Sequence, residues 1–123
     1  MSESKYHIEQ TKHNKDFLNE IEDSIFYDWI TTTIFYTALH YLDSFFDIFF
    51  NEHPQTHEER MRLLEEKVRN GKKFSKKIWK SYLRLMNDSK TARYYPDQWR
   101  TKLNKERIQT LLKDLEIVKN REM

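Results

Sequence analysis

The sequence predicts an all-α protein, a single bundle of four to five helices. Its 123 residues include one glycine and two prolines, too few for the many tight turns of a sheet protein. Glutamate, lysine, leucine and arginine, which favour helices, are frequent. Apolar residues recur at helical spacing in several long segments. A chain of this length buries one core, so we expect residues 1–123 to form one domain.

The first two helices are expected at about residues 6–23 and 25–50. Either Asp23 or Ser24 can cap the start of the second helix, because both carry a short side chain that accepts hydrogen bonds. The first helix has a modest apolar stripe, which consists of Ile8, Phe17, Leu18 and Ile21.

The second helix is predicted to be the central helix of the bundle. Apolar and aromatic residues cover more than half of its circumference, and polar side chains collect in the remaining sector. Charged residues interrupt the run well before the roughly 18 apolar residues of a membrane span, so no membrane association is expected. The polar sector contains Trp29, Thr32, Thr33, Tyr36, His40, Asp43, Ser44 and Asp47.

Three further helices are predicted from end signals and from apolar spacing. Thr56 and Glu59 have the spacing of a capping box that opens a third helix, and Gly71 suits the left-handed residue that closes it. A fourth helix is expected from about Ser75 until Pro96 stops it. The last is expected at about residues 104–121, where leucines and isoleucines follow helical spacing.

Composition limits the chemistry. The chain has no cysteine, which excludes disulfides, thiolate metal sites and cysteine nucleophiles. The first 15 residues are polar and show no signal peptide, so a cytoplasmic location is expected. We expect no cofactor and no metal; a site built from His40, Asp43, His53 and His57 is disfavoured because Pro54 opposes a helix at His53.

Charge is distributed unevenly. Residues 1–60 carry 4 Lys/Arg against 12 Asp/Glu, whereas residues 61–123 carry 18 against 8. The steepest stretch is residues 69–93, where nine basic residues oppose Asp88 alone. Such a segment can attract phosphate backbones or an acidic partner, although a solvated surface is the common use of lysines. We select Lys73, Lys76 and Lys77 as candidate contacts to a nucleic acid.

Three segments together resemble the HEPN superfamily, and more narrowly its small stand-alone bacterial and archaeal members. They are "FYTALH" at 35–40, "TH" at 56–57 and "ARYY" at 92–95. Each segment alone is degenerate; their order and spacing carry the resemblance, which spans about residues 28–118. It implies an up-and-down helical bundle of HEPN type that commonly forms homodimers, and members that act as metal-independent ribonucleases, often in toxin–antitoxin systems or phage defence.

The chain departs from the catalytic pattern of that family. Active members use an arginine, a short spacer and a histidine, but the first arginine here is Arg60 and the last histidine is His57. A linear site of that kind is therefore absent, and an enzyme is not the leading expectation.

Three functional interpretations stay open. The first is a non-catalytic HEPN-like module that binds RNA, a nucleotide or a partner protein. Lysines and arginines would hold phosphates in such a module, while aromatic side chains stack on bases. For Trp79 and Tyr82, a place in the core is a better explanation than base stacking. The remaining binding candidates, besides the three lysines, are Tyr36, Asp43, Tyr94 and Trp99.

The second interpretation is a ribonuclease whose site is assembled in space, possibly from two chains. His40 or His57 would do acid–base work, and Arg60 or Arg93 would hold phosphate. Each of these residues also has a purely structural interpretation. His40 can form a hydrogen bond to Asp43 or to a tyrosine, and His57 and Arg60 can orient the loop that precedes them. Arg93 can pair with the acidic N-terminal half of the chain. The third interpretation is a structural or regulatory assembly subunit with exposed aromatic anchors.

Overall fold

The computed structural model describes residues 2–21 and 26–123, and these residues form six helices. All-α architecture is thereby confirmed, and the described ranges contain no strand. The helices are α1 (Ser2–Ile21), α2 (Tyr27–Phe50), α3 (His57–Arg69), α4 (Lys76–Tyr94), α5 (Pro96–Lys102) and α6 (Lys105–Lys119).

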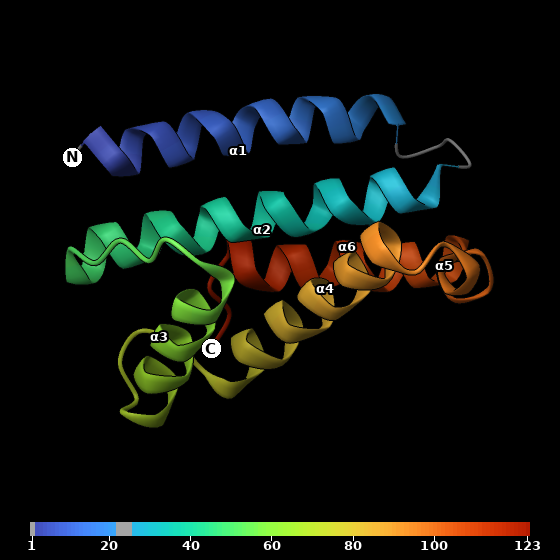
Figure 1. Ribbon diagram of the computed structural model, residues 1–123. Helices are drawn as coiled ribbons and strands as arrows, with labels where there is room; N and C mark the ends of the chain where they lie inside the picture. The colour runs from blue at the N-terminus through green and yellow to red at the C-terminus, as the bar shows by residue number, and fades with distance from the viewer. Residues whose placement is uncertain (1, 22–25) are drawn as a thin grey trace.

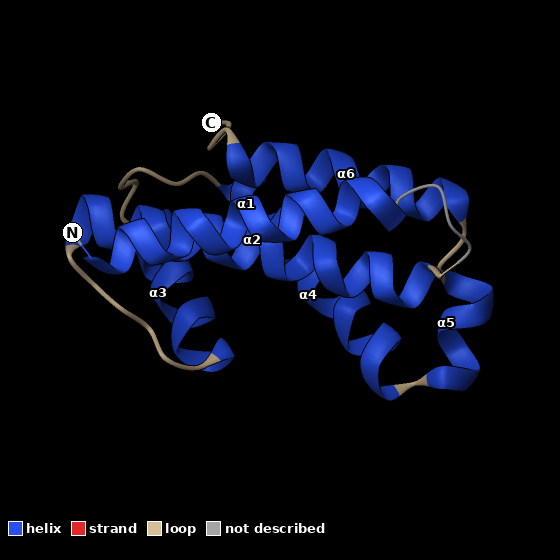
Figure 2. Cartoon of the chain, turned by 90° about the horizontal axis from the view of Figure 1, so that it is seen from above, coloured by secondary structure: helices blue, strands red, loops and turns tan. Residues whose placement is uncertain are grey.

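Helices α2, α4 and α6 pack against one another and form the core of the bundle. Helix α1 lies along α2 on the side away from α4 and α6, and the four long helices alternate in direction (Figure 1). Helix α3 stands apart from the bundle axis beside α4, while α5 lies at the opposite end (Figures 1 and 2). The predicted up-and-down topology thus belongs to α1, α2, α4 and α6, with α3 and α5 inserted in the connections.

Helix α2 supplies the largest part of the buried apolar surface, as its residue pattern predicted. Ile34, Phe35 and Leu42 are fully inaccessible, and they meet buried residues of α4 and α6 such as Tyr82 and Leu111. Burying each such side chain contributes about 1.5–3 kcal/mol, so α2 holds the bundle together. The predicted core position of Tyr82 is confirmed, because its side chain is buried. That of Trp79 is confirmed in part, because Trp79 is half-buried.

Both predicted ends of α3 are confirmed. The hydroxyl of Thr56 accepts the backbone N–H of Glu59, and the Glu59 carboxylate accepts the backbone N–H of Gln55. Helix α3 closes at Asn70, after which Gly71 has φ 64° and its N–H bonds to the carbonyl of Val68. A side chain at Gly71 would be strained in this left-handed conformation, which explains where the only glycine stands.

The predicted stop at Pro96 is confirmed, but the helix that follows it was missed. Pro96 does end α4, but it is also the first residue of α5, a seven-residue helix that was not predicted. Proline suits this position because the first helical N–H needs no partner and the ring presets φ. Ser75 and Asn104 cap α4 and α6 through bonds to the backbone N–H groups of Ile78 and Arg107.

The predicted apolar stripe of α1 holds only in part. Leu18 is buried, whereas Ile8 and Phe17 are exposed. The side chain of Ile21 lies outside the described residues, as do Asp23 and Ser24. The expected cap of the second helix at Asp23 or Ser24 is wrong, because α2 begins at Tyr27 and Phe26 is its N-cap residue. None of the described helices is both long enough and apolar enough to cross a membrane.

Candidate functional site

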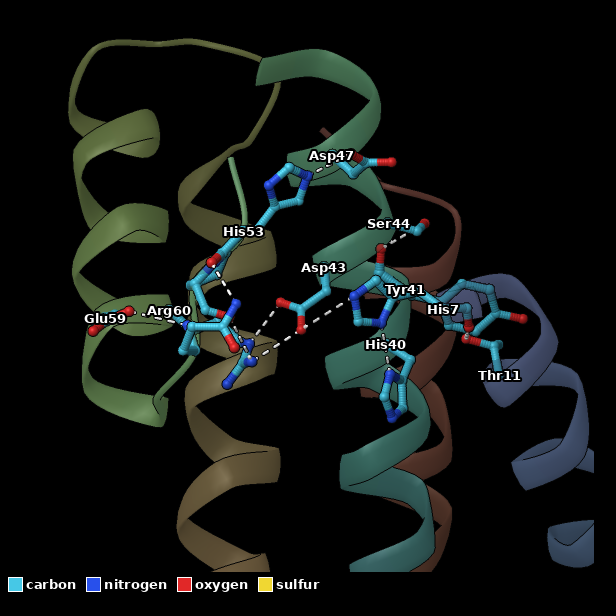
Figure 3. Close-up of polar contacts among 12 residues, drawn as sticks. His7, Thr11, His40, Tyr41, Asp43, Ser44, Asp47, His53, Glu59 and Arg60 are labelled. Atoms are coloured by element: carbon cyan, nitrogen blue, oxygen red, sulfur yellow. Dashed lines mark hydrogen bonds and ion pairs between the residues drawn. The ribbon is translucent and has the colours of Figure 1, made fainter. Parts of the chain in front are cut away.

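Asp43 and Arg60 form a buried ion pair between α2 and α3. Arg60 Nε lies 2.6 Å from Asp43 Oδ1 and Arg60 Nη2 lies 2.9 Å from Oδ2, so the pair is bidentate (Figure 3). Asp43 is 4% exposed and Arg60 is 6% exposed. Burial alone would lower the pKa of Arg60, but its bonds to Asp43 outweigh burial and raise that pKa. Asp43 and Arg60, both predicted as site residues, are therefore engaged with each other.

His40 contacts a second histidine on α1. His7 Nδ1 lies 2.9 Å from His40 Nδ1, and His7 Nε2 lies 4.0 Å from Asp43 Oδ2. One Nδ1 atom must accept while the other donates, so at least one of the two rings is neutral. Burial, followed by the charges of His7 and Arg60, lowers the pKa of His40 to about 4.

The residues of the Asp43–Arg60 pair and of the His7–His40 contact line one cavity. It has a volume of about 300 Å³ and lies between the first turns of α1, the middle of α2 and the loop before α3. Tyr6, Leu39, Pro54 and Gln55 complete its lining. Figure 3 shows His7, His40 and Asp43 facing one another around this region. Polar residues of three elements thus meet at one place on α2.

Polar contacts also hold the loop between α2 and α3. His53 Nε2 lies 2.7 Å from Asp47 Oδ1, and the buried Lys67 ammonium lies 2.9 Å from Glu52 Oε1. Arg60 Nη2 also donates to the carbonyl of Pro54 at 3.4 Å. These contacts fix the loop that places His57 at the start of α3.

Arg93 is positioned by tyrosine side chains. Its Nη1 donates to the hydroxyls of Tyr36 at 2.9 Å and Tyr94 at 3.4 Å, and its Nε donates to Ser89. The guanidinium carbon lies 5.5 Å from the ring centroid of Tyr36 and 5.0 Å from that of Tyr94, within range of cation–π attraction. In the described part of the chain, no carboxylate pairs with Arg93.

His57 lies beside the same rings. Its ring centroid is 5.6 Å from that of Phe35 and 6.2 Å from that of Tyr36, while the Arg93 guanidinium is 5.9 Å from Phe35. Its Nδ1 accepts a bond from Arg60 Nη1 at 3.5 Å. Burial, then the charges of Arg60, Arg93 and Lys90, lower the pKa of His57. These effects favour the neutral form of the His57 imidazole.

We use the name arginine–tyrosine surface for Tyr36, His57, Lys90, Arg93 and Tyr94. Four of these residues were predicted as site residues, and the fold brings them together from α2, α3 and α4. Lys90 is exposed and joins them on α4. Tyr94 is 64% exposed and therefore offers a ring to a ligand.

The other predicted binding residues lie elsewhere. Lys76 is 17 residues before Arg93 on α4, which corresponds to about 26 Å along the helix. Lys73 lies over the ring of Phe49, and Lys77 pairs with Glu122 at 3.0 Å. Trp99 is half-buried on α5. The three lysines are thus not part of the arginine–tyrosine surface.

No group of three His, Asp or Glu side chains able to hold a metal is found in residues 2–21 and 26–123. The residues considered for a metal are directed to different partners, since His53 binds Asp47 and His40 binds His7. His7 was not among the predicted site residues. Its role depends on how α1 docks, and the spacing of 33 residues to His40 carries no local signal.

Comparison of this chain with known proteins finds no relative. No protein-family model matches the chain, and neither a curated protein nor a solved structure matches it.

Proposed function

We propose that this protein is a HEPN-like module that binds single-stranded RNA through the arginine–tyrosine surface. The observation that carries the proposal is Arg93. Tyrosines hold its guanidinium in place, and no described carboxylate neutralises it. An arginine fixed in this way is suited to phosphate recognition, because its donors are oriented before the ligand arrives.

The neighbouring groups fit the same ligand. Tyr94 exposes most of its ring, and base–aromatic stacking contributes about 1–3 kcal/mol per base. Lys90 adds an exposed positive charge one turn before Tyr94. Single-stranded RNA presents both unstacked bases and phosphates, so stacking and ion pairing can occur together.

Electrophoretic retardation of single-stranded RNA tests this proposal. We expect the unmodified chain to retard RNA, and Arg93→Gln to weaken binding by about tenfold or more. Lys113→Gln is the matched control, because Lys113 is exposed on α6 and lies outside the arginine–tyrosine surface. The proposal fails if RNA is not retarded, or if both variants bind equally. Failure would favour a protein partner for the same exposed aromatic residues.

One observation supports a second candidate, an endoribonuclease with an assembled site. His57 and Arg93 flank the rings of Phe35 and Tyr36, so a histidine and an arginine meet without a linear motif. The imidazole of His57, whose neutral form burial favours, would accept the 2′-hydroxyl proton as that oxygen attacks the adjacent phosphorus, while Arg93 holds the phosphate. The bond from phosphorus to the 5′-oxygen breaks, and the departing oxygen takes a proton from water. A partner chain could also contribute, as homodimers are implied by the resemblance.

Cleavage separates the two candidates. For a nuclease, His57→Gln abolishes cleavage of end-labelled RNA but preserves retardation, and EDTA leaves the rate unchanged. For a binding module, the unmodified chain retards RNA without cutting it. Cleavage that survives His57→Gln would exclude the assembled site.

A further inference from the structure

A basic cavity lies between α4, α5 and α6. Its volume is about 330 Å³, and four cationic side chains line it together with a single carboxylate, that of Asp88. The cations come from all three helices: Lys80 and Arg84 from α4, Lys102 from α5, and Arg107 from α6. We call this cavity the α4–α6 groove.

The carboxylate in the groove is already neutralised. Asp88 is 1% exposed, and both its oxygens pair with Arg107, at 2.6 Å from Nε and 3.1 Å from Nη2. Bidentate pairing fixes the plane of the guanidinium. The third nitrogen, Arg107 Nη1, takes no part in this pair. Asp88 therefore orients a cation at the groove and does not repel an anion from it.

The second arginine is held in a similar way. Arg84 Nη1 lies 3.1 Å and 3.2 Å from the two oxygens of Asp114, which is 2% exposed. Both bonds use Nη1, so Nε and Nη2 of Arg84 lie outside the pair. The Arg84 side chain is 40% exposed. Two guanidinium groups on facing helices are thus fixed by buried carboxylates while their remaining donors stay outside those pairs.

The charge balance of the groove favours an anion. Lys80 and Lys102 are exposed and form no ion pair within the described residues. With Asp88 and Asp114 each matched by an arginine, the two lysines leave an excess of positive charge. Oriented donors beside excess positive charge are the features that bind phosphate tightly, because little reorganisation is needed on binding.

We propose that the α4–α6 groove binds a phosphate group, held by Arg84 and Arg107 and attracted by Lys80 and Lys102. The proposal does not rest on RNA binding at the arginine–tyrosine surface. Arg93 follows Arg84 by nine residues, which turns a helix by about half a revolution, so the two sites lie on opposite faces of α4. The phosphate could belong to a small phosphorylated compound or to an RNA backbone.

The test is an NMR titration of the full chain with inorganic phosphate, read at the Nε–Hε signals of its arginines. We expect the signals of Arg84 and Arg107 to shift together with one saturating curve, while that of Arg62, an exposed arginine of α3, does not follow it. The proposal is overturned if millimolar phosphate moves neither signal, or moves all arginine signals alike.

Variants give the second readout. Removing either arginine could unfold the chain by leaving a buried carboxylate unpaired, so the variants are Lys80→Gln, Lys102→Gln and Arg84→Lys. We expect the lysine variants to weaken phosphate binding by about threefold or more, and Arg84→Lys by about tenfold, because lysine lacks the fork of donors. Lys113→Gln should bind as the unmodified chain does. Equal affinity in all four variants would overturn the proposal.

The source of the phosphate is decided by titrating a short single-stranded RNA under the same conditions. If RNA shifts Arg84 and Arg107 and competes with inorganic phosphate, the groove binds RNA backbone. If RNA leaves both signals unchanged while phosphate moves them, the groove binds small phosphorylated compounds. Either result supports the groove, and neither depends on Arg93.

Discussion

At the scale of single residues, the polar side chains within the aromatic run of α2 connect other elements to it. Asp43 binds Arg60 of α3, and His40 binds His7 of α1. Position 43 therefore needs a carboxylate although it is buried, because it compensates a buried guanidinium. The sequence showed these residues on one sector of a helix, but it could not show which cation or which imidazole they would meet.

The ion pair gives the first prediction. Removing one partner leaves an uncompensated buried charge, so Asp43→Ala is expected to lower the free energy of unfolding by about 3–5 kcal/mol. Urea denaturation followed by circular dichroism at pH 7 measures this. Glu58→Ala is the control, since Glu58 pairs with Arg62 on the surface and should cost less than about 1 kcal/mol. A loss at Asp43 no larger than at Glu58 would contradict this role.

The histidine pair predicts a pH dependence. The pKa of His40 falls from 6.5 to about 4 on folding, so between these values the unfolded chain binds more protons than the folded one. Stability is retained above pH 6.5 and decreases as the pH falls towards about 4. The contribution is at most about 3 kcal/mol and is reduced by partial exposure of the ring. His7, Asp43 and Arg60 are the charged groups that face it.

Comparing the unmodified chain with His40→Gln checks this dependence. The difference in unfolding free energy between the two should change by about 1–3 kcal/mol between pH 7 and pH 4. A difference that is constant across this range would show that His40 does not titrate as described.

At the scale of helices, the end signals of α3 were more informative than the apolar stripe of α1. Thr56, Ser75 and Asn104 each accept the backbone N–H three residues later. Such bonds depend only on local spacing, so they can be predicted from sequence. The buried residues of α1 could not be predicted from its apolar stripe, because α1 packs chiefly on α2 and leaves Ile8 and Phe17 exposed. Helix α5 was missed because Pro96 signals both the end of one helix and the start of another.

Gly71 supplies the prediction at this scale. Gly71→Ala should lower the free energy of unfolding by about 1 kcal/mol, because φ is 64° and a β-carbon disfavours that region. No heavy atom lies within 4 Å of the added carbon, so the cost is conformational and not steric. Gly71→Asn should cost less, since asparagine tolerates this conformation. Thermal unfolding of the two variants measures the difference. Equal losses for both would contradict a purely conformational cost.

At the scale of the whole molecule, the fold divides the positive charge among separate places. The sequence suggested one basic segment, but the part of it in α4 lies at the first turns of the helix, along the α4–α6 groove and at Arg93. The division could not be predicted, because it depends on which face of α4 each neighbouring helix covers.

This division predicts unequal effects of charge changes on RNA affinity. Lys76→Glu is expected to weaken RNA binding by less than about threefold, since Lys76 lies about 26 Å from Arg93 along α4. Lys90→Glu should weaken it by about tenfold, because it places a negative charge beside Arg93. Fluorescence anisotropy at two salt concentrations measures both. Larger losses from Lys76→Glu would relocate the RNA site to the first turns of α4.

The central claim is that RNA binds at the arginine–tyrosine surface, and a ¹H–¹⁵N NMR titration with a short single-stranded RNA tests it most directly. The account predicts that the backbone signals of Tyr36, His57, Lys90, Arg93 and Tyr94 shift along one saturating curve, and that Arg93→Gln removes these shifts while the remaining spectrum is preserved. Shifts confined to other residues, or no shifts at all, would contradict it.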